Sequence, residues 1–409
     1  MNKFLKEFKE RGFFYQCTDE KELSLLLDTK KIRGYIGFDC TAESLHVGSL
    51  LQIMCLRLLQ KHGHRPIVLL GGGTTRIGDP SGKDKTRSIL KEKVIEKNKK
   101  NIEKILKKFL NFEDSKTKPI FVNNYSWLKG LNYISFLRDI GKHFTINKML
   151  SFDSVKTRLE REQSLSYMEF NYMILQAYDF LELNKKEDCA LQIGGSDQWG
   201  NIINGVELIK RHSNKKTYGL TTPLITLASG TKMGKTESGA IWLDKKLLSS
   251  YDYWQFWRNT DDRDVVKFLK IFTELDMDEI NTIKNNDINK LKVLLANKAT
   301  TMLHGSKAAS DSEQSAKEAF SGNLHGSKQP LFRIKKSNLT KSLNIIDLII
   351  LSKLESSKSE VRRLIKGNAI KINNKIISDD KFVIKEELFD DDYIKLSIGK
   401  KRHLKIELN

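Results

Sequence analysis

The sequence predicts an α/β fold built around a doubly wound parallel sheet. Two short apolar runs, at residues 32–38 and 65–70, are bounded by Gly and Pro, which is typical of buried strands. Between them, residues 48–62 carry apolar side chains at helical spacing. A strand, a helix and a second strand in this order form a βαβ unit, whose two strands lie parallel in one sheet.

Two later apolar runs, at residues 119–122 and 190–193, predict further strands of the same sheet. Ligands of doubly wound sheets bind beyond the carboxyl ends of the strands. Acidic and glycine residues follow two of the predicted strands, near Asp39 and Gly194. We therefore expect the functional site at this edge of the sheet.

The second half of the chain differs in pattern. Residues 249–320 have helical spacing and more charge, without a convincing strand. Gly and Pro between residues 326 and 330 indicate a linker. We expect four parts along the chain: an α/β domain at 1–220, a helical domain at 221–325, a linker at 326–340 and a small α+β domain at 341–409.

Charge and composition restrict the class of protein. The 409 residues contain 71 Lys or Arg and 51 Asp or Glu, a formal net charge of +20. This excess favours a polyanionic partner, although a solvated Lys-rich surface explains it equally well. The 4 Cys are far apart, which argues against a disulfide framework or a metal site. Without an apolar signal segment or a membrane-length apolar run, we expect a cytoplasmic protein without a membrane partner.

The first chemical motif lies where the predicted strand 32–38 gives way to a helix. It contains His46, Gly48 and Ser49. Backbone N–H groups at a helix start favour an anion, and a glycine lets a ligand approach the backbone closely. Taken alone the motif is weak, because a histidine cap and a packing glycine would look the same.

The second motif contains Lys232, Lys235 and Thr236. Two ammonium groups and a hydroxyl in a glycine-containing loop suit a clamp on a polyphosphate. Such a clamp would bind the transition state more tightly than the substrate, which raises turnover. In a Lys-rich chain this spacing also arises by chance.

Together the two motifs resemble the nucleotide signatures of class I aminoacyl-tRNA synthetases. The residues between them narrow the resemblance to the bacterial-type tyrosyl-tRNA synthetases, over roughly residues 8–404. The resemblance implies a Rossmann-like catalytic domain that binds ATP and tyrosine, then an anticodon-side helical domain. The family usually has a second His where this chain has Ser49, which is a shorter hydrogen-bond donor.

A third motif places Tyr172, Gln176 and Asp179 on one face of a helix predicted over residues 165–183. Polar groups on such a face are costly to bury without a polar ligand, although a solvated stripe has the same spacing. The resemblance implies that Asp179 and Tyr35 meet the phenol of tyrosine. It also implies four residues around the ammonium group of tyrosine: Thr74, Asp79, Tyr172 and Gln176.

A fourth motif follows the predicted strand 190–193. Its glycine pair frees the backbone to approach a ligand, and Asp197 can accept both hydroxyls of a ribose. By resemblance, Gln192 and Gln198 belong to the tyrosine site. The residues expected to bind ATP are Gly37, Asp39, Thr41, His46, Gly48, Gly194, Asp197 and Lys235. Those expected to act in catalysis are His46, Ser49, Lys232, Lys235 and Thr236.

The C-terminal part resembles the small RNA-binding module named after a small-subunit ribosomal protein. Residues 353–375 contain seven Lys or Arg against two Glu. Basic side chains at these positions would contact the phosphates and shape of an RNA rather than its base edges. The residues expected to bind tRNA are Lys358, Arg362, Arg363 and Lys366.

The function expected from these motifs is that of a tyrosine–tRNA ligase. The enzyme would form tyrosyl-adenylate and pyrophosphate from tyrosine and ATP, then transfer tyrosine to the 3′-terminal adenosine of tRNA(Tyr). Mg²⁺ would be held by ATP, without a protein cage. The resemblance also implies a homodimer, with a candidate contact face around Phe144, Tyr167 and Phe170.

Three alternatives remain open at this point. Tyr35 and Asp179 argue against a tryptophanyl enzyme of the same architecture, because they suit a phenol. The basic C-terminal module argues against a nucleotidyltransferase for small molecules. Ser49 is the one departure that would support a catalytically idle RNA-binding relative.

Overall fold

The computed structural model describes residues 1–81, 90–231, 233–236, 239–321, 331–339, 343–355, 357–390, 392–399 and 402–409. The chain divides into two compact units. The first contains residues 1–249 and 256–303, and the second contains residues 250–255 and 304–409.

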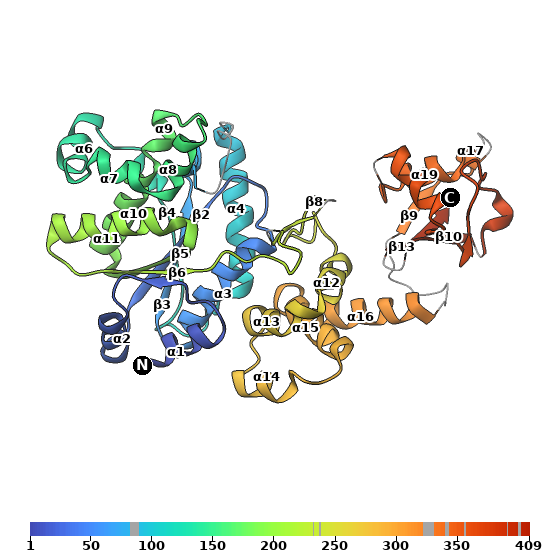
Figure 1. The fold of residues 1–409 in the computed structure, drawn as a ribbon, viewed down its shortest axis with the longest axis horizontal. Coiled ribbons are helices and arrows are strands. Elements are labelled where there is room, and N and C mark those ends of the chain that lie inside the picture. Colours follow the sequence, from blue (N-terminus) through green and yellow to red (C-terminus); the bar gives the residue numbers. More distant parts are fainter. Residues whose placement is uncertain are drawn as a thin grey trace. The chain divides into compact units, whose positions relative to one another are not determined.

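The first unit is built on a six-stranded sheet of strand order β1-β6-β5-β2-β3-β4 (Figure 1). Its strands are β1 (Gln16–Cys17), β2 (Arg33–Asp39), β3 (Arg65–Gly71), β4 (Ile120–Asn123), β5 (Cys189–Gly195) and β6 (Tyr218–Thr222). All neighbouring strands pair in parallel except β1, which pairs antiparallel with β6. This sheet confirms the predicted doubly wound fold.

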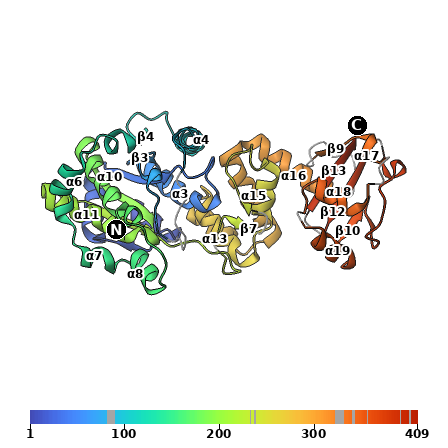
Figure 2. The same cartoon turned by 90° about the horizontal axis from the view of Figure 1, so that it is seen from above.

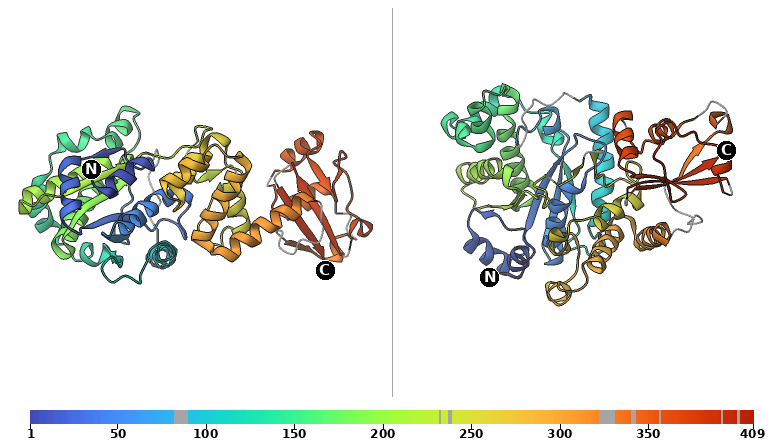
Figure 3. Two further views of the ribbon diagram at one scale, coloured as in Figure 1. Left: turned by 90° about the horizontal axis from the view of Figure 1, so that it is seen from below. Right: turned by 45° about the vertical axis from the view of Figure 1, so that its right-hand side comes forward.

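The order of the strands creates a switch point between β2 and β5. From β2 the chain builds outward through β3 to β4, and it then returns to place β5 on the other side of β2. The crossover helices consequently divide between the two faces of the sheet. Figure 1 and Figure 3 show α10 and α11 on one face, with α3 and α4 on the other. A crevice for a ligand is expected where the carboxyl ends of β2 and β5 diverge.

The helices of the first unit follow their local signals. Its helices up to the end of the sheet are α1 (Lys3–Glu10), α2 (Glu20–Thr29), α3 (Val47–Lys61), α4 (Glu92–Phe109), α5 (Tyr125–Leu128), α6 (Tyr133–Asp139), α7 (Ile146–Ser151), α8 (Asp153–Glu160), α9 (Tyr167–Phe170), α10 (Tyr172–Glu187) and α11 (Trp199–Ser213). The helix predicted over residues 165–183 is therefore two helices. The Asn171 side chain donates to the Tyr167 carbonyl, and such competition with the backbone ladder disfavours a continuous helix.

The predicted helical region after the sheet is also present. It contains α12 (Ser250–Arg258), α13 (Asp262–Phe272), α14 (Met277–Ile283), α15 (Ile288–His304) and α16 (Ser306–Ser321). Just before it, β7 (Lys235–Thr236) and β8 (Gly239–Ala240) form a small antiparallel pair. Among the described residues, every helix is too short or too polar to cross a lipid bilayer.

The second unit ends in a five-stranded sheet with helices packed against it (Figure 2). Its strands are β9 (Leu331–Ile334), β10 (Ile370–Ile372), β11 (Lys375–Ile376), β12 (Tyr393–Ile398) and β13 (Arg402–Leu408), and its helices are α17 (Lys336–Leu339), α18 (Ile345–Leu351) and α19 (Lys358–Lys366). β9 lies within residues 326–340, the range expected as a linker. It pairs in parallel with β13 and buries Ile334, so residues 331–334 belong to the sheet. Residues 326–330 and 340 lie outside the described residues.

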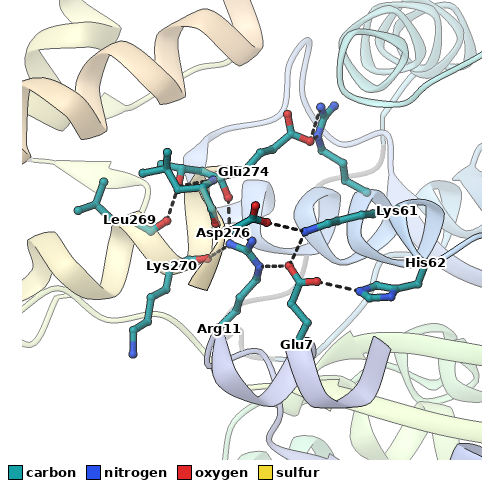
Figure 4. A network of polar contacts seen from close by, with 11 residues as sticks. Glu7, Arg11, Lys61, His62, Leu269, Lys270, Glu274 and Asp276 are labelled. Atoms are coloured by element: carbon teal, nitrogen blue, oxygen red, sulfur yellow. Dashed lines mark hydrogen bonds and ion pairs between the residues drawn. The ribbon is translucent and has the colours of Figure 1, made fainter. Parts of the chain in front are cut away.

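A buried ion-pair network joins α1 to α3 and to the end of α13 (Figure 4). Arg11 is 4% exposed, and it donates to the carbonyls of Lys270 (2.8 Å), Thr273 (3.1 Å) and Leu275 (2.8 Å). These include carbonyl groups at the end of α13 that have no partner within the helix. Glu7 accepts from Arg11 at 2.8 Å and also contacts Lys61 and His62 near the end of α3. Arg11 and Glu7 together therefore connect three helices, Arg11 through the end of α13 and Glu7 through the end of α3.

Arg11→Ala should lower the free energy of unfolding by about 3 kcal/mol, because it leaves buried carbonyl groups without their donor and removes one of the three partners of the Glu7 carboxylate. The control is Lys6→Ala, which removes an exposed pair of 3.8 Å with Glu10 on the same helix. The control should change the free energy of unfolding by less than about 1 kcal/mol. Urea denaturation followed by circular dichroism measures both, and equal losses would contradict this role for Arg11.

Candidate active site

A cavity of about 390 Å³ lies at the switch point, beyond the carboxyl ends of β2 and β5. Residues at the strand ends, at the start of α3 and on one face of α10 line it. The predicted site residues that line it are Tyr35, Gly37, Asp39, Thr41, His46, Gly48, Ser49, Thr74, Asp79, Tyr172, Gln176, Asp179, Gln192, Gly194, Asp197 and Gln198. The fold thus brings three of the four sequence motifs to one place, whereas Lys235 and Thr236 of the second motif are not among the lining residues.

The two nucleotide motifs meet at the start of α3. The backbone N–H of Val47 donates to the Ile241 carbonyl, and the N–H of Leu243 donates to the Leu45 carbonyl, each at 2.9 Å. This pairing holds the segment that follows β8 against the turn that precedes α3. Residues almost two hundred positions apart therefore share one wall of the cavity.

Two glycines allow this contact. A Cβ atom on Gly48 would lie 2.8 Å from the Met233 carbonyl oxygen. Gly234 has a φ of +99°, and a Cβ atom there would lie 2.6 Å from Nδ1 of His46. Side chains at either position would clash, and the Gly234 backbone would also be strained.

His46 caps α3 and has a defined orientation. Its Nδ1 atom accepts from the Gly48 N–H at 3.0 Å. A neutral histidine that accepts at Nδ1 carries its proton on Nε2. The ring can therefore offer an Nε2–H donor at a helix start, where an anion is favoured.

The lysine motif is described in part. The backbone of Lys235 and Thr236 forms β7, close behind Gly234. Lys232 lies outside the described residues.

The middle of the cavity carries two aspartates in a hydrogen-bond network. Asp39 accepts from the Thr74 hydroxyl at 2.8 Å and from the Tyr172 hydroxyl at 3.0 Å. Asp79 accepts from the Gln198 amide at 2.9 Å. Two carboxylates on one cavity favour a cationic group of the ligand.

The buried end of the cavity is formed by Asp179 and Tyr35, each 1% exposed. Asp179 accepts from the Asn124 amide at 2.9 Å and from the Trp127 indole at 2.8 Å. Burial raises the pKa of Asp179 to about 7, although both hydrogen bonds act to lower it. The Tyr35 hydroxyl has no hydrogen-bond partner among the described residues. A buried hydroxyl in this state is expected to pair with a ligand.

Asn124 and Trp127 are functional candidates that sequence reasoning missed. Asn124 is fully buried, and its amide also donates to the Thr74 hydroxyl at 3.0 Å. It thereby links Asp179 at the buried end to Thr74 in the middle of the cavity. One signal was available, because Asn124 comes two residues after the predicted strand 119–122, at the carboxyl edge of the sheet. Gln52 and Trp242, which line the cavity itself, are among the other residues that sequence reasoning missed.

The predicted RNA-binding side chains lie together on α19. All four are exposed. Lys358 contacts Asp347 at 2.8 Å, Arg362 contacts Asp380 at 3.5 Å, and Arg363 contacts Glu360 at 2.6 Å. Exposed pairs of this kind contribute little, so an RNA phosphate could replace the acidic partners at low cost.

Comparisons with known proteins identify the class. A family model described as tRNA synthetases class I (W and Y) matches residues 27–321, so the chain belongs to the class I tRNA synthetases. A second model, described as the tyrosine–tRNA ligase SYY-like C-terminal domain, matches residues 328–406.

The relatives narrow the class to one family. A tyrosine–tRNA ligase from Pelagibacter ubique is 76% identical over 408 residues and covers 100% of both chains. One from a Wolbachia of Brugia malayi is 54% identical and covers 99% of this chain and 98% of its own. Within its class, the chain belongs to the tyrosine–tRNA ligases, as the sequence motifs predict.

A solved structure agrees with this assignment. A C-terminally truncated mitochondrial tyrosyl-tRNA synthetase from Aspergillus nidulans has a TM-score of 0.70 and 32% identity. The match covers 78% of this chain and 94% of that chain. A tyrosyl-tRNA synthetase from Archaeoglobus fulgidus, complexed with L-tyrosine, shares the fold at a TM-score of 0.57 and 19% identity, covering 75% of this chain and 99% of its own.

The raised pKa of Asp179 makes stability depend on pH. The folded chain holds a proton on Asp179 up to about pH 7, whereas the unfolded chain releases it near the ordinary value of 3.8. Acid therefore favours the folded state, and this contribution is lost as pH rises from about 4 to about 7. Asp179→Asn removes the titration, so the variant should gain about 2 kcal/mol relative to wild type between about pH 5 and about pH 8.

Urea unfolding of both proteins across this pH range measures the difference. Altered hydrogen bonds in the variant change its free energy of unfolding by the same amount at every pH. The change with pH in the difference between the two proteins therefore reports the titration of Asp179 alone. A difference that stays constant with pH would show that Asp179 is ionised throughout.

Proposed function

We propose that this cavity carries out tyrosine activation with the phenol at its buried end and ATP at the start of α3. The observation that carries the proposal is that two buried groups line the same cavity: the Tyr35 hydroxyl, which has no hydrogen-bond partner among the described residues, and the Asp179 carboxylate. A phenol can accept from one and donate to the other. An amino acid without that hydroxyl would leave the buried Tyr35 hydroxyl unpaired and Asp179 with only its Asn124 and Trp127 donors, which is a basis for strong discrimination.

The polar middle of the cavity would hold the backbone groups of tyrosine. The ammonium group would lie among Thr74, Asp79, Tyr172 and Gln176, where the carboxylates supply negative charge. Gln192 and Gln198 would lie beside the carboxylate of tyrosine. Because Thr74 and Tyr172 also donate to Asp39, the site is already ordered around this position.

ATP would occupy the other end of the cavity. Gly48 and Gly194 permit close approach of the nucleotide, Asp197 would accept the ribose hydroxyls, and Asp39, with Gly37 and Thr41 near it, would contact the adenylate. His46 and Ser49 would donate to the phosphates, with Lys232, Lys235 and Thr236 on the leaving pyrophosphate. Mg²⁺ would enter with ATP, because phosphate oxygens are ligands that it prefers. Among the described residues, no group of three or more His, Cys, Asp or Glu is arranged to hold a metal ion.

The reaction then needs positioning and charge stabilisation rather than a protein nucleophile. An oxygen of the tyrosine carboxylate attacks the α-phosphorus of ATP, and the bond to the pyrophosphate oxygen breaks. In the second step, the 2′- or 3′-hydroxyl of the terminal adenosine of tRNA attacks the tyrosyl carbonyl, and AMP leaves. Donors at the α3 start and the lysines would stabilise charge that develops on the phosphates.

We propose the following division of labour along the chain. The first 220 residues bind ATP and tyrosine, residues 221–325 supply the second motif and an anticodon-side helical domain, and the C-terminal sheet domain with α19 contacts tRNA(Tyr). We also propose a cytoplasmic location, which cell fractionation would test.

A homodimer is the proposed assembly. Large apolar side chains are exposed on α6 to α9: Tyr133, Ile134, Leu137, Ile146, Leu150, Leu159 and Tyr167. Tyr167 belongs to the contact face expected from the sequence, whereas Phe144 and Phe170 are half-buried beside it. An apolar patch of this size on one side of a domain favours a protein partner, here a second copy. Sedimentation of a monomer at micromolar concentration would contradict this assembly.

Tyr35 and Asp179 should determine the preference for tyrosine over phenylalanine. Tyr35→Phe removes one hydrogen-bonding group and should lower the ratio of kcat/KM for the two amino acids by roughly tenfold. Asp179→Asn should lower it further, because an amide donor would face the Asn124 and Trp127 donors. Tyr178→Phe is the control, since Tyr178 lies on the same helix outside the cavity lining.

The measurement is ATP–pyrophosphate exchange, run first with every amino acid on the wild type. Tyrosine should be the amino acid that supports exchange. If the ratio of kcat/KM for tyrosine and phenylalanine stayed at the wild-type value in both folded variants, Tyr35→Phe and Asp179→Asn, the phenol would bind elsewhere.

The basic side chains of α19 should serve tRNA and not adenylation. Changing Lys358, Arg362, Arg363 and Lys366 together to Gln should raise the KM for tRNA and flatten its dependence on salt, because fewer counterions are released. Pyrophosphate exchange should be unchanged. The matched control changes four exposed lysines of α4 to Gln: Lys93, Lys100, Lys104 and Lys108. If the α19 and α4 substitutions changed tRNA aminoacylation equally, the effect would come from the net charge of the protein and not from α19.

A further inference from the structure

The loop that leads into the lysine motif is held from outside the cavity. This signature loop, residues 223–231 and 233–234, follows β6 and folds back on itself. The Met233 N–H donates to the Ile225 carbonyl at 3.0 Å, and the Leu227 N–H donates to the Thr231 carbonyl at 2.9 Å. The loop is therefore a hairpin. Gly234, at its base, lies against His46, and the turn at its tip contains Ala228.

That turn is bound by α13. The Ala228 N–H donates to Oδ2 of Asp264 at 2.6 Å, and the Lys267 ammonium donates to the Thr226 carbonyl at 3.1 Å. Asp264 lies in the first turn of α13 and is 5% exposed. A hydrogen bond to a buried carboxylate is stronger than one between neutral groups. Asp264 thus makes a directional contact with the backbone of the signature loop.

The far end of α13 is held to α3, the helix whose first turns line the cavity. Arg11 binds the carbonyls at the end of α13, and Glu7 connects it to Lys61 and His62. Arg57 of α3 contacts Glu274 at 2.6 Å, just beyond α13. Figure 4 shows the contacts of Lys61 and His62, near the end of α3, with this network. The start of α3 carries His46 and Gly48, which lie against Gly234 and Met233 of the signature loop, so α3 contacts both the loop and the support of α13.

We propose that Asp264 is a positioning residue for adenylation, which acts by holding the signature loop so that Met233 and Gly234 lie against His46 and Gly48. The inference rests on the proposed role of this loop in tyrosine activation. Asp264 is not among the residues that line the cavity. It sets the position of the backbone that carries the lysine motif, and catalysis is sensitive to small displacements of such groups.

Asp264→Ala should lower kcat/KM for ATP in tyrosine-dependent pyrophosphate exchange by roughly tenfold, while the dissociation constant of tyrosine without ATP stays at the wild-type value. Asp264→Asn should recover most of the activity, because its carbonyl oxygen can still accept from the Ala228 N–H. Lys267→Met removes the second contact from an exposed position, and it should give a smaller loss in the same direction.

The matched control is Asp262→Ala. Asp262 lies in the same first turn of α13, but it is exposed and pairs with Lys292 rather than with the loop. The control removes the same charge from the helix start and should leave exchange unchanged.

Three results would overturn the proposal. One is normal exchange by Asp264→Ala and by Lys267→Met. Another is a parallel loss of tyrosine affinity, which would indicate a structural role. The third is equal impairment by Asp264→Ala and Asp262→Ala. If Asp264→Ala does not fold, Lys267→Met and Asp264→Asn still distinguish these outcomes. Absence of tyrosine-dependent exchange in the wild type would overturn the proposed function itself, which is a different result.

Discussion

The close approach of two glycine backbones at the start of α3 is the constraint on which the active site depends. Gly48 faces the Met233 carbonyl and Gly234 faces the His46 ring, at separations that a Cβ atom would close to less than 3 Å. The pairing of residues 45–47 with 241–243 holds this contact in place. Without this contact, His46 and the segment that carries Trp242, both of which line the cavity, would not meet at the start of α3.

The buried end of the cavity is governed by a different balance. Placing Asp179 out of water costs stability, and the Asn124 and Trp127 hydrogen bonds offset only part of that cost, as the raised pKa of Asp179 shows. The Tyr35 hydroxyl is also unsatisfied by the described residues. Both groups lower the stability of the folded chain, because a buried polar group without a full set of partners keeps part of its desolvation cost. A matching phenol would stabilise the folded chain on binding.

Local patterns predict four of the six strands of the large sheet and the edge of the sheet at which the cavity lies, whereas the residues proposed for the site rest on the family resemblance. β2, α3 and β3 follow from apolar runs and glycine punctuation, and the site follows from what comes after β2 and β5. Contacts between distant side chains could not be predicted in this way. Asn124 meets Asp179 through a contact between the residue after β4 and α10, more than fifty positions apart in the sequence, and no periodicity encodes that contact. The break at Asn171 and the strand β9 depend on one side-chain hydrogen bond and one long-range pairing, which residue patterns also do not reveal.

Replacement of Gly234 by alanine tests the central constraint most directly, with Gly230→Ala as its control. Both glycines have positive φ angles, +99° and +81°, so both variants carry a similar backbone strain. A Cβ atom at Gly230 meets nothing within 4 Å, whereas one at Gly234 meets His46. Tyrosine-dependent pyrophosphate exchange should therefore fall about 100-fold in Gly234→Ala, with tyrosine binding intact, and should stay near the wild-type rate in Gly230→Ala. Equal rates in the two variants would contradict the account.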